Sequence, residues 1–333
     1  MKIGILGAGA IGCFIGGRLI AAGHDVVLVG RLGAELAEHG LTLTDYRGRR
    51  TVLAPERVKY RPDVDALADR DVVLVTVKSM ATSDAVRPLA KILGPSAIVV
   101  SFQNGVCNAD AIRRVLPGRT VLAGMVPFNV LREDGGRFHL GTSGPLALER
   151  AGGAEARLVG ALRGAEFGVE LHEDLASVLW SKLLFNLNNS VNALAGIPLR
   201  DELSNPAYRR VVAASMREAL RCMRAARIRP ARVGKMIPFL APYLLSLPNA
   251  LFFRVAGTMV KIDPAARSSM WEDLERRRPT EIDYLNGEII RLGERHGVPV
   301  PVNRRIRELV RAAEEAKRGS PRLPPDALLS SLG

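Results

Sequence analysis

The chain has 333 residues, of which 47% are hydrophobic and 24% are charged. This length exceeds the usual size of a single hydrophobic core, so two domains are expected. The net charge of +13 would suit a nucleic-acid-binding protein. However, the arginines are scattered through predicted helices, and no helix-turn-helix, RNA-binding or zinc-finger signature is present. We therefore interpret the charge as arginine-rich solvated faces that also attract anionic ligands, and we expect no nucleic-acid partner.

The cysteines and the N-terminal residues indicate the cellular compartment of the protein. Cys13, Cys107 and Cys222 are far apart and form no CxxC motif, which predicts neither a metal site nor a disulfide framework. Lys2 followed by an apolar run superficially resembles a secretory signal, but the glycines that follow and Arg18 argue against one. We therefore expect a cytoplasmic protein with reduced thiols.

The first thirty residues carry the most informative motif. An apolar run at 3–6 precedes a glycine-rich loop, a helical pattern then ends at Gly23, and a second apolar run covers 26–29. This pattern predicts a dinucleotide-binding βαβ unit whose helix N-terminus holds the phosphates. The glycines suit a tight turn, a close approach of the backbone to the pyrophosphate, and close packing of helix on strand. The loop consists of Gly7, Ala8, Gly9, Ala10, Ile11 and Gly12.

The residue after the second predicted strand indicates which dinucleotide is bound. NAD-specific proteins usually have Asp or Glu here, against the ribose 2′-hydroxyl. In this chain the strand ends in Gly30-Arg31, and a guanidinium suits a 2′-phosphate. The sequence thus predicts NADPH as the cofactor, with a solvated surface arginine as the alternative for Arg31.

Two further apolar runs predict buried parallel strands. One covers 71–78 and ends in Lys78; the other covers 97–105 and ends in Gln-Asn-Gly, with the asparagine at Asn104. Ligands of open α/β sheets bind beyond the carboxyl ends of the strands, so Lys78 and Asn104 are candidate binding residues. The alternatives are a surface lysine and a simple turn.

The rest of the first domain is expected to end near residue 172. A run at 119–126 predicts another strand, and the alternation at 138–149 predicts an antiparallel strand with one exposed face. From 173 to 318 the apolar spacing is helical, which predicts an all-α second domain. The tail at 319–333 looks loosely structured.

One stretch of the second domain raises the question of a membrane. Residues 236–260 are strongly apolar. Pro238, Pro242, Pro248 and Arg254 divide the stretch into short pieces, so it predicts a kinked helix pair or a subunit interface rather than a spanning helix. A homodimer would suit the second of these.

The predicted helix at 174–194 carries the strongest catalytic candidate. Lys182 and Asn186 are four residues apart and so share a face, and Ser190 lies a turn further on. The residues at 183–185 are all apolar, and partial burial would lower the pKa of the lysine and make it a better proton donor near neutrality. The alternative is a lysine that extends its amine to solvent from an amphipathic helix.

Two residues near later helix starts are also candidates. Ser269 precedes a predicted helix, and Glu281 follows Pro279 near the start of the next one. Both have structural alternatives, since Ser269 could be a helix cap and Glu281 an acid that complements a helix dipole.

Together these motifs resemble those of the ketopantoate reductase (2-dehydropantoate 2-reductase) family. They occur in the family's order over nearly the whole chain, and the lysine and TEIDYLNG segments are more specific than the glycine loop. The matching motifs are GAGAIG at 7–12, Arg31, VTVKS around Lys78, QNG at 103–105, LWSKLLFN at 179–186, SSM at 268–270 and TEIDYLNG at 280–287.

The resemblance implies an α/β N-terminal Rossmann domain with a mostly parallel sheet, followed by an all-α C-terminal domain. It implies NADPH-dependent reduction of ketopantoate to pantoate in pantothenate and coenzyme A synthesis. By resemblance, Lys182 is the general acid and Glu281 its supporting carboxylate. A small 2-oxo acid is then the partner, and no metal is expected.

The resemblance also assigns the surrounding residues. It implies substrate contacts from Asn104, Asn186, Ser190 and Ser269, with Asn104 and Lys78 also on the cofactor side. Many members carry a second substrate-contacting asparagine where this chain has Ser190, flanked by Asn189 and Asn192, so the natural substrate is the least constrained part of the prediction.

Two other functions stay open at this stage. One is a related NADP-dependent 2-oxo or 3-hydroxy acid dehydrogenase, because many activities share the fold and the cofactor loop. The other is a non-catalytic NADPH-binding sensor, which would have no reason to keep both Lys182 and Glu281.

Overall fold

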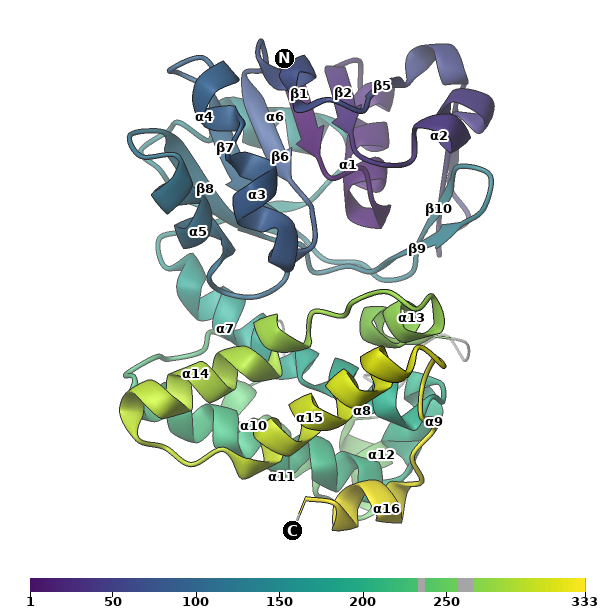
Figure 1. The fold of residues 1–333 in the computed structure, drawn as a ribbon, viewed down its shortest axis with the longest axis vertical. Coiled ribbons are helices and arrows are strands. Elements are labelled where there is room, and N and C mark those ends of the chain that lie inside the picture. Colours follow the sequence, from purple (N-terminus) through teal and green to yellow (C-terminus); the bar gives the residue numbers. More distant parts are fainter. Residues whose placement is uncertain (233–236, 257–265, 333) are drawn as a thin grey trace. The chain divides into compact units, whose positions relative to one another are not determined.

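The computed structural model describes residues 1–232, 237–256 and 266–332, and the chain divides into two compact units, Met1–Leu175 and Ala176–Gly333. In Figure 1 the purple-to-teal unit is built from strands and helices, and the teal-to-yellow unit from helices. The boundary between the units lies after Leu175, the first residue of α7 (Leu175–Asn186), slightly beyond the boundary near residue 172 that the sequence predicted.

An eight-stranded sheet forms the centre of the first unit, in the order β12-β11-β8-β7-β6-β1-β2-β5. Neighbouring strands in it run parallel except for β8 and β11, which pair antiparallel. The sheet is therefore mostly parallel, as predicted. Its strands are β1 (Lys2–Leu6), β2 (Asp25–Val29), β5 (Lys59–Arg61), β6 (Val72–Val75), β7 (Ile98–Ser101), β8 (Thr120–Met125), β11 (Leu146–Glu149) and β12 (Val169–His172).

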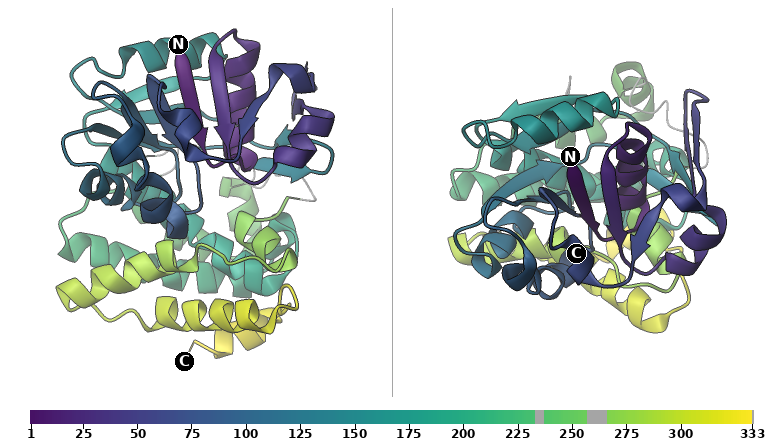
Figure 2. Two further views of the ribbon diagram at one scale, coloured as in Figure 1. Left: turned by 45° about the horizontal axis from the view of Figure 1, so that its top comes forward. Right: turned by 90° about the horizontal axis from the view of Figure 1, so that it is seen from above.

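Helices cover both faces of this sheet, which explains why its central strands are apolar throughout (Figure 2). One core cluster joins α1 and α6 to one face, and a second joins α3, α4 and α5 to the other. The helices of this unit are α1 (Ala10–Ala21), α2 (Gly33–His39), α3 (Thr82–Val86), α4 (Leu89–Ile92), α5 (Asn108–Val115) and α6 (Ala156–Gly164), with 3₁₀ turns η1 (Pro55–Arg57), η2 (Val64–Leu67) and η3 (Ser79–Ala81).

A second sheet of four strands, in the order β4-β3-β10-β9, packs beside α1. Its strands are β3 (Leu41–Asp45), β4 (Arg50–Leu53), β9 (Val130–Glu133) and β10 (Arg137–Leu140). The prediction of one antiparallel strand at 138–149 is wrong, because this stretch supplies β10 to the small sheet and β11 to the large one. Gly144, with φ of +158°, and Pro145 interrupt it.

The second unit is helical, and α10 (Pro206–Ala225) packs against many of its other helices. Its side chains are buried along one face, as the 3.6-residue period of an amphipathic helix requires. The other helices are α8 (Asn188–Ala195), α9 (Leu199–Ser204), α11 (Ala241–Leu245), α12 (Asn249–Ala256), α13 (Ser269–Glu275), α14 (Asn286–His296), α15 (Pro301–Ala316) and α16 (Pro325–Ser330), with 3₁₀ turns η4 (Pro238–Leu240) and η5 (Ile282–Tyr284).

The apolar stretch at 237–256 forms η4, α11 and α12, so its described part is a series of short helices rather than one long one. Buried Arg209 on α10 holds it in place. The guanidinium donates to the carbonyls of Leu245 and Leu247 at 3.0 and 2.8 Å and lies 4.2 Å from the centre of the Phe252 ring. None of the helices in the described ranges combines the length and the apolarity needed to cross a membrane.

The C-terminal tail is more ordered than its composition suggested. The Leu323 N–H donates to the Leu194 carbonyl at 2.9 Å, and the Tyr208 hydroxyl donates to the Leu323 carbonyl at 2.7 Å. α16 follows, with Leu328 fully buried. The expectation of a loosely structured tail is therefore wrong, because packing against α8 and α10 orders residues whose local sequence has little preference.

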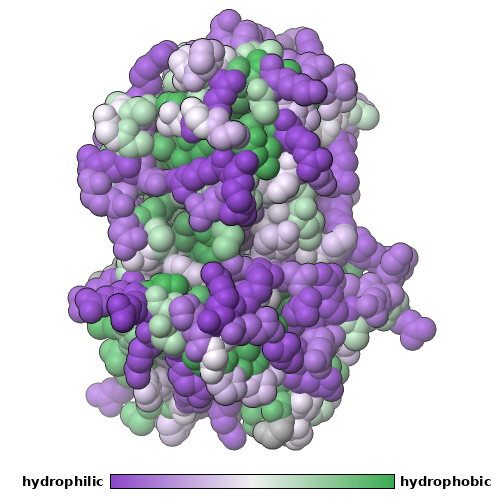
Figure 3. Space-filling view, turned by 60° about the vertical axis from the view of Figure 1, so that its left-hand side comes forward, coloured by the Kyte–Doolittle hydropathy of each residue, from purple (hydrophilic) through white to green (hydrophobic). Residues whose placement is uncertain are grey.

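Hydrophilic side chains are distributed among apolar ones over the face shown in Figure 3 rather than gathered in one patch. Many arginines form surface ion pairs, such as Arg87 with Asp84 and Arg304 with Glu294. Such pairs contribute little to stability individually. Part of the positive charge is thus paired with acids on the solvated surface.

Candidate active site

The glycine loop forms a tight turn between β1 and α1. Gly7 has φ of +115°, and the N–H groups of Gly7 and Ala8 both donate to the Val29 carbonyl at 2.9 Å. The Thr76 hydroxyl, at the end of β6, donates to the Gly7 carbonyl at 2.7 Å. The loop is therefore fastened to both strands that flank β1.

The N-terminus of α1 is suited to an anion. The helix has no acidic residue in its first turn and no side-chain cap, and its first backbone hydrogen bond runs from the Cys13 N–H to the Gly9 carbonyl at 2.9 Å. The N–H groups of Ala10, Ile11 and Gly12 precede that bond, at the positive end of the helix dipole. This is the arrangement that holds phosphates in dinucleotide-binding proteins.

The space around the glycines fits a pyrophosphate. A Cβ atom added to Gly9 would meet nothing within 4 Å, so the backbone there is open to a ligand. A Cβ atom on Gly12 would overlap the Gly7 carbonyl and lie 2.6 Å from the Thr76 hydroxyl. Gly12 is thus required by packing, whereas Gly9 leaves room for a dinucleotide.

The loop after β2 carries Arg31, whose side chain is exposed. The Tyr60 hydroxyl on β5 donates to the Gly30 carbonyl, and its ring lies so close to Gly33 that a Cβ there would overlap it. Tyr60 therefore fixes the course of the loop that presents Arg31 at the carboxyl ends of β2 and β5.

Lys78 and Asn104 follow β6 and β7, and a buried polar cluster joins the two loops. The Ser79 hydroxyl donates to the Asn104 carbonyl at 2.9 Å, and the Asn108 side chain donates to the Ser79 hydroxyl at 3.1 Å. Gln103 donates to the Val77 carbonyl at 2.9 Å. The structure thus brings both predicted residues to the same edge of the sheet. These hydrogen bonds hold the backbone of both loops.

Lys182 lies on α7, half-buried, with Asn186 one turn later on the same face. Burial lowers the pKa of Lys182 to about 8, and the carboxylate of Glu281 acts in the opposite direction by favouring the ammonium form. The structure therefore brings together the two residues predicted to form the catalytic pair, although they are far apart in the sequence.

The backbone around Glu281 is firmly held. Thr280 before it donates its N–H to the Glu314 carboxylate at 2.6 Å, and the Ile282 N–H after it donates to the Thr280 hydroxyl at 3.2 Å. Asp283 accepts a hydrogen bond from Arg307 at 2.6 Å. Glu314 and Arg307 both lie on α15 (Pro301–Ala316), so this helix holds the segment that carries Glu281.

The start of α13 differs from the prediction in detail. Ser268, not Ser269, is the helix cap, and its hydroxyl accepts a hydrogen bond from the Trp271 N–H at 3.2 Å. The Ser268 hydroxyl also donates to the Asn189 carbonyl at 3.1 Å. Ser269 is the first helical residue and is exposed, which leaves its hydroxyl accessible; its role in substrate binding stays a prediction.

A buried carboxyl group supports this helix start. Asn192 donates to the Glu202 carboxyl at 2.7 Å and accepts from the Ser268 N–H at 2.9 Å. Glu202 is fully buried, and burial raises its pKa to about 8 against the opposing effect of hydrogen bonds from Asn192 and Asn188. Sequence reasoning missed Glu202, which looks like an ordinary first-turn acid in the stretch LRDELS.

Ser190 is more buried than the other predicted substrate-binding residues, and its role in substrate binding stays a prediction. It is fully buried, and its hydroxyl donates to the Leu187 carbonyl at 2.8 Å within the helical backbone. The expected helix at 174–194 in fact divides at Leu187 into α7 and α8.

No group of three or more His, Cys, Asp or Glu side chains that could hold a metal ion occurs among the described residues. The first unit offers a dinucleotide-binding loop, and the second offers a lysine with a near-neutral pKa beside a carboxylate. Together these features are those of a nicotinamide-dependent oxidoreductase.

Comparison with known proteins gives the particular family. The model of "Ketopantoate reductase PanE/ApbA" matches residues 3–153, and that of its C-terminal domain matches residues 174–314. The chain belongs to the ketopantoate reductase family, whose members are NADPH-dependent oxidoreductases.

Individual relatives agree over nearly the whole chain. The 2-dehydropantoate 2-reductase of Archaeoglobus fulgidus is 28% identical over 319 residues, covering 94% of this chain and 98% of the relative. The crystal structure of a PanE/ApbA family ketopantoate reductase from Ralstonia eutropha is 31% identical, with a TM-score of 0.82, and covers 96% of this chain and 100% of its own.

A second activity occurs on the same fold. The ternary structure of a D-mandelate dehydrogenase with NADH and anilino(oxo)acetate has a TM-score of 0.79, covering 95% of this chain and 99% of its own. At 23% identity it is similar in fold alone.

Proposed function

We propose that this protein reduces 2-dehydropantoate to pantoate with NADPH, delivering hydride to C2 of the 2-oxo acid. The observation that carries the proposal is the pairing of Lys182, whose pKa is lowered to about 8, with Glu281, in a chain of this family with an intact glycine loop. When bound, NADPH supplies the hydride.

Lys182 is proposed as the general acid. As hydride adds to the carbonyl carbon, negative charge develops on the oxygen, and an ammonium within hydrogen-bond reach stabilises that charge before donating its proton. A pKa of about 8 keeps most of the lysine protonated at neutral pH yet lets it release the proton readily. Glu281 keeps Lys182 charged and aligned.

The remaining residues would bind and orient the substrate and cofactor. We propose that Asn186, Ser269 and Asn104 position the 2-oxo acid, while Lys78 lies near the nicotinamide and its ribose. Ser190 is left out of this group because it is buried and bonded to Leu187. Fixing the carbonyl against the hydride donor and acid removes much of the entropic cost of reaction.

The cofactor would be held by residues 7–12 and by Arg31. The first turn of α1 would bind the pyrophosphate, and the exposed guanidinium of Arg31 would pair with the 2′-phosphate. Use of NADPH and the free thiols of Cys13, Cys107 and Cys222 suit a cytoplasmic enzyme, and the proposal includes that location.

A second candidate is the reduction of another 2-oxo acid, such as an aryl-substituted one. The observation that favours it is the replacement of the family's second asparagine by buried Ser190, together with the D-mandelate dehydrogenase fold relative. A change in substrate contacts at that turn would alter which side chain of the 2-oxo acid is accepted.

The test is NADPH oxidation by the purified protein with ketopantoate beside other 2-oxo acids. We expect the highest kcat/KM for ketopantoate. A clear preference for benzoylformate, which is an aryl-substituted 2-oxo acid, or for a branched 2-oxo acid other than ketopantoate would support the second candidate. Tight NADPH binding without turnover of any 2-oxo acid would contradict both.

A further inference from the structure

β5 carries a cation at each end, and the two ends differ in their surroundings. Lys59 is its first residue and Arg61 its last. β5 lies at the edge of the large sheet and pairs in parallel with β2. Lys59 therefore lies at the amino edge of the sheet, and Arg61 lies at the carboxyl edge, where ligands of such sheets bind.

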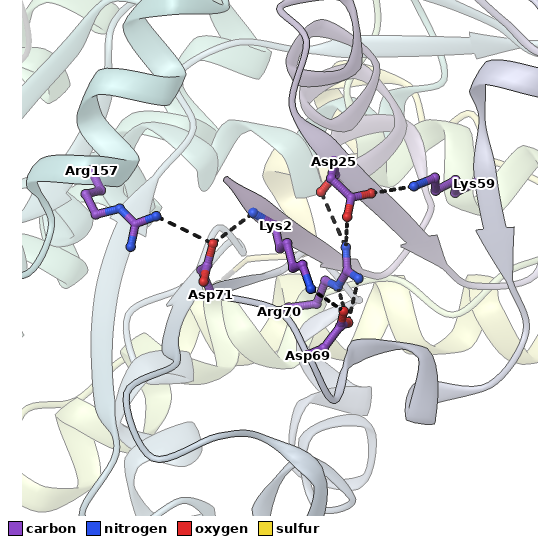
Figure 4. A network of polar contacts seen from close by, with 7 residues as sticks. All are labelled: Lys2, Asp25, Lys59, Asp69, Arg70, Asp71 and Arg157. Atoms are coloured by element: carbon purple, nitrogen blue, oxygen red, sulfur yellow. Dashed lines mark hydrogen bonds and ion pairs between the residues drawn. The ribbon is translucent and has the colours of Figure 1, made fainter.

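At the amino edge the cations are matched by acids, as Figure 4 shows. Lys59 pairs with Asp25 at 2.7 Å, and Arg70 pairs with Asp25 and Asp69 at 3.0 and 2.5 Å. Lys2 also pairs with Asp69, at 2.9 Å. This network balances the charges at the amino edge, and the Lys59–Asp25 pair links β5 to β2.

At the carboxyl edge Arg31 and Arg61 have no such match among the described residues. The register pairs Arg61 with Val29, two residues before Arg31, and both arginines are exposed. Arg61 donates one hydrogen bond, to the Tyr60 carbonyl at 2.7 Å. No carboxylate in the described part of the chain forms an ion pair with either arginine.

The geometry also brings the two arginines close. Arg61 lies one strand spacing of about 4.8 Å from Val29, and two residues of chain span at most about 7 Å, so the Cα atoms of Arg61 and Arg31 lie within roughly 12 Å. Tyr60, next to Arg61, binds the Gly30 carbonyl next to Arg31. The two side chains can thus reach a common ligand.

We propose that Arg61 is a second binding residue for the 2′-phosphate of NADPH, acting with Arg31. The inference rests on the proposed cofactor. A phosphate monoester carries about 1.5 to 2 negative charges near neutral pH, so a single guanidinium leaves part of that charge unbalanced. A second planar fork neutralises it and adds directed hydrogen bonds.

The experiment measures binding of two cofactor fragments by isothermal titration calorimetry, with no 2-oxo acid present. Adenosine 2′,5′-bisphosphate contains the 2′-phosphate, and adenosine 5′-monophosphate lacks it. Arg61→Ala should weaken binding of the bisphosphate about tenfold or more and leave the monophosphate unchanged. Arg61→Lys, which keeps the charge but not the fork, should be intermediate.

Lys59→Ala is the matched control, because it removes the same charge from the same strand at the opposite edge. It should leave the preference between the two ligands unchanged. Thermal melts of each variant check that the fold is intact.

The outcomes separate this inference from the proposed function. Equal weakening of both ligands by Arg61→Ala, or no weakening, would overturn the role of Arg61 while leaving the NADPH proposal in place. A wild-type protein that binds both ligands equally would overturn the 2′-phosphate site as a whole. Neither result depends on which 2-oxo acid the enzyme reduces.

Discussion

The carboxylate of Glu281 opposes the effect of burial on Lys182. Burial alone favours the neutral amine, and the carboxylate restores part of the preference for the ammonium, with the pKa settling at about 8. In the proposed reaction the lysine must begin charged and end neutral. A pKa near the working pH suits both states.

The first prediction concerns pH. The kcat/KM for 2-oxo acid reduction should be level below about pH 8 and fall about tenfold per pH unit above it, as Lys182 loses its proton. Glu281→Gln removes the negative charge that favours the ammonium, so the fall should begin at lower pH. Steady-state kinetics from pH 6 to 10 measure both profiles; coincident profiles would show that Glu281 does not act on Lys182.

The second prediction concerns the loss of the acid. Lys182→Ala should lower kcat by about 100-fold or more while NADPH affinity and thermal stability change little. Lys317→Ala, an exposed lysine of the same unit, should leave kcat unchanged. In combination with Glu281→Gln, the loss should be smaller than the product of the separate losses. Wild-type kcat in Lys182→Ala would make Lys78 the next candidate.

The third prediction concerns cofactor choice. Arg31→Ala should raise the KM for NADPH about 10- to 100-fold and change the KM for NADH little, because it removes a charged hydrogen bond that only the 2′-phosphate can make. The measurement is kinetics with both cofactors. Equal KM values for NADPH and NADH in the unmutated enzyme would contradict the assignment of Arg31 to the 2′-phosphate.

The fourth prediction separates two glycines of one loop. Gly12→Ala should destabilise the protein, because the new methyl group overlaps the Gly7 carbonyl. Gly9→Ala should fold normally, because the methyl group enters open space, but should weaken NADPH binding by keeping the pyrophosphate away. Thermal melts and NADPH titrations of both variants distinguish the roles, and similar behaviour of the two would contradict them.

The fifth prediction concerns Glu202. Its pKa is raised from 4.5 to about 8, so the folded protein holds a proton that the unfolded chain releases, and stability is lost as pH rises from about 4.5 to 8. Glu202→Gln keeps the hydrogen bond from Asn192 but cannot ionise. The melting temperature of this variant should therefore decline less over that interval; identical curves would mean that Glu202 does not titrate in it.

Features with a local pattern were predictable from the sequence. The glycine loop, the apolar strands around it and the lysine helix each follow from residue type and spacing within a short window. Gly12, for example, is needed because the helix packs against the strand that precedes it by only a few residues.

Features that depend on distant partners were not predictable in the same way. Glu202 and Ser190 are polar residues whose burial is decided by the packing of other helices. The tail after Lys317 is ordered by the hydrogen bonds of Leu323 with Leu194 and Tyr208. In each case the decisive neighbour lies in another part of the chain.

The small sheet has a consequence for the order of folding. β3 (Leu41–Asp45) pairs with β10 (Arg137–Leu140), and the intervening chain includes β5, β6, β7 and β8 of the large sheet. Closing so long a loop is entropically costly until the large sheet has brought its ends together. We therefore expect the β3–β10 pairing to form late in folding, so substitutions in it should hasten unfolding and barely slow folding.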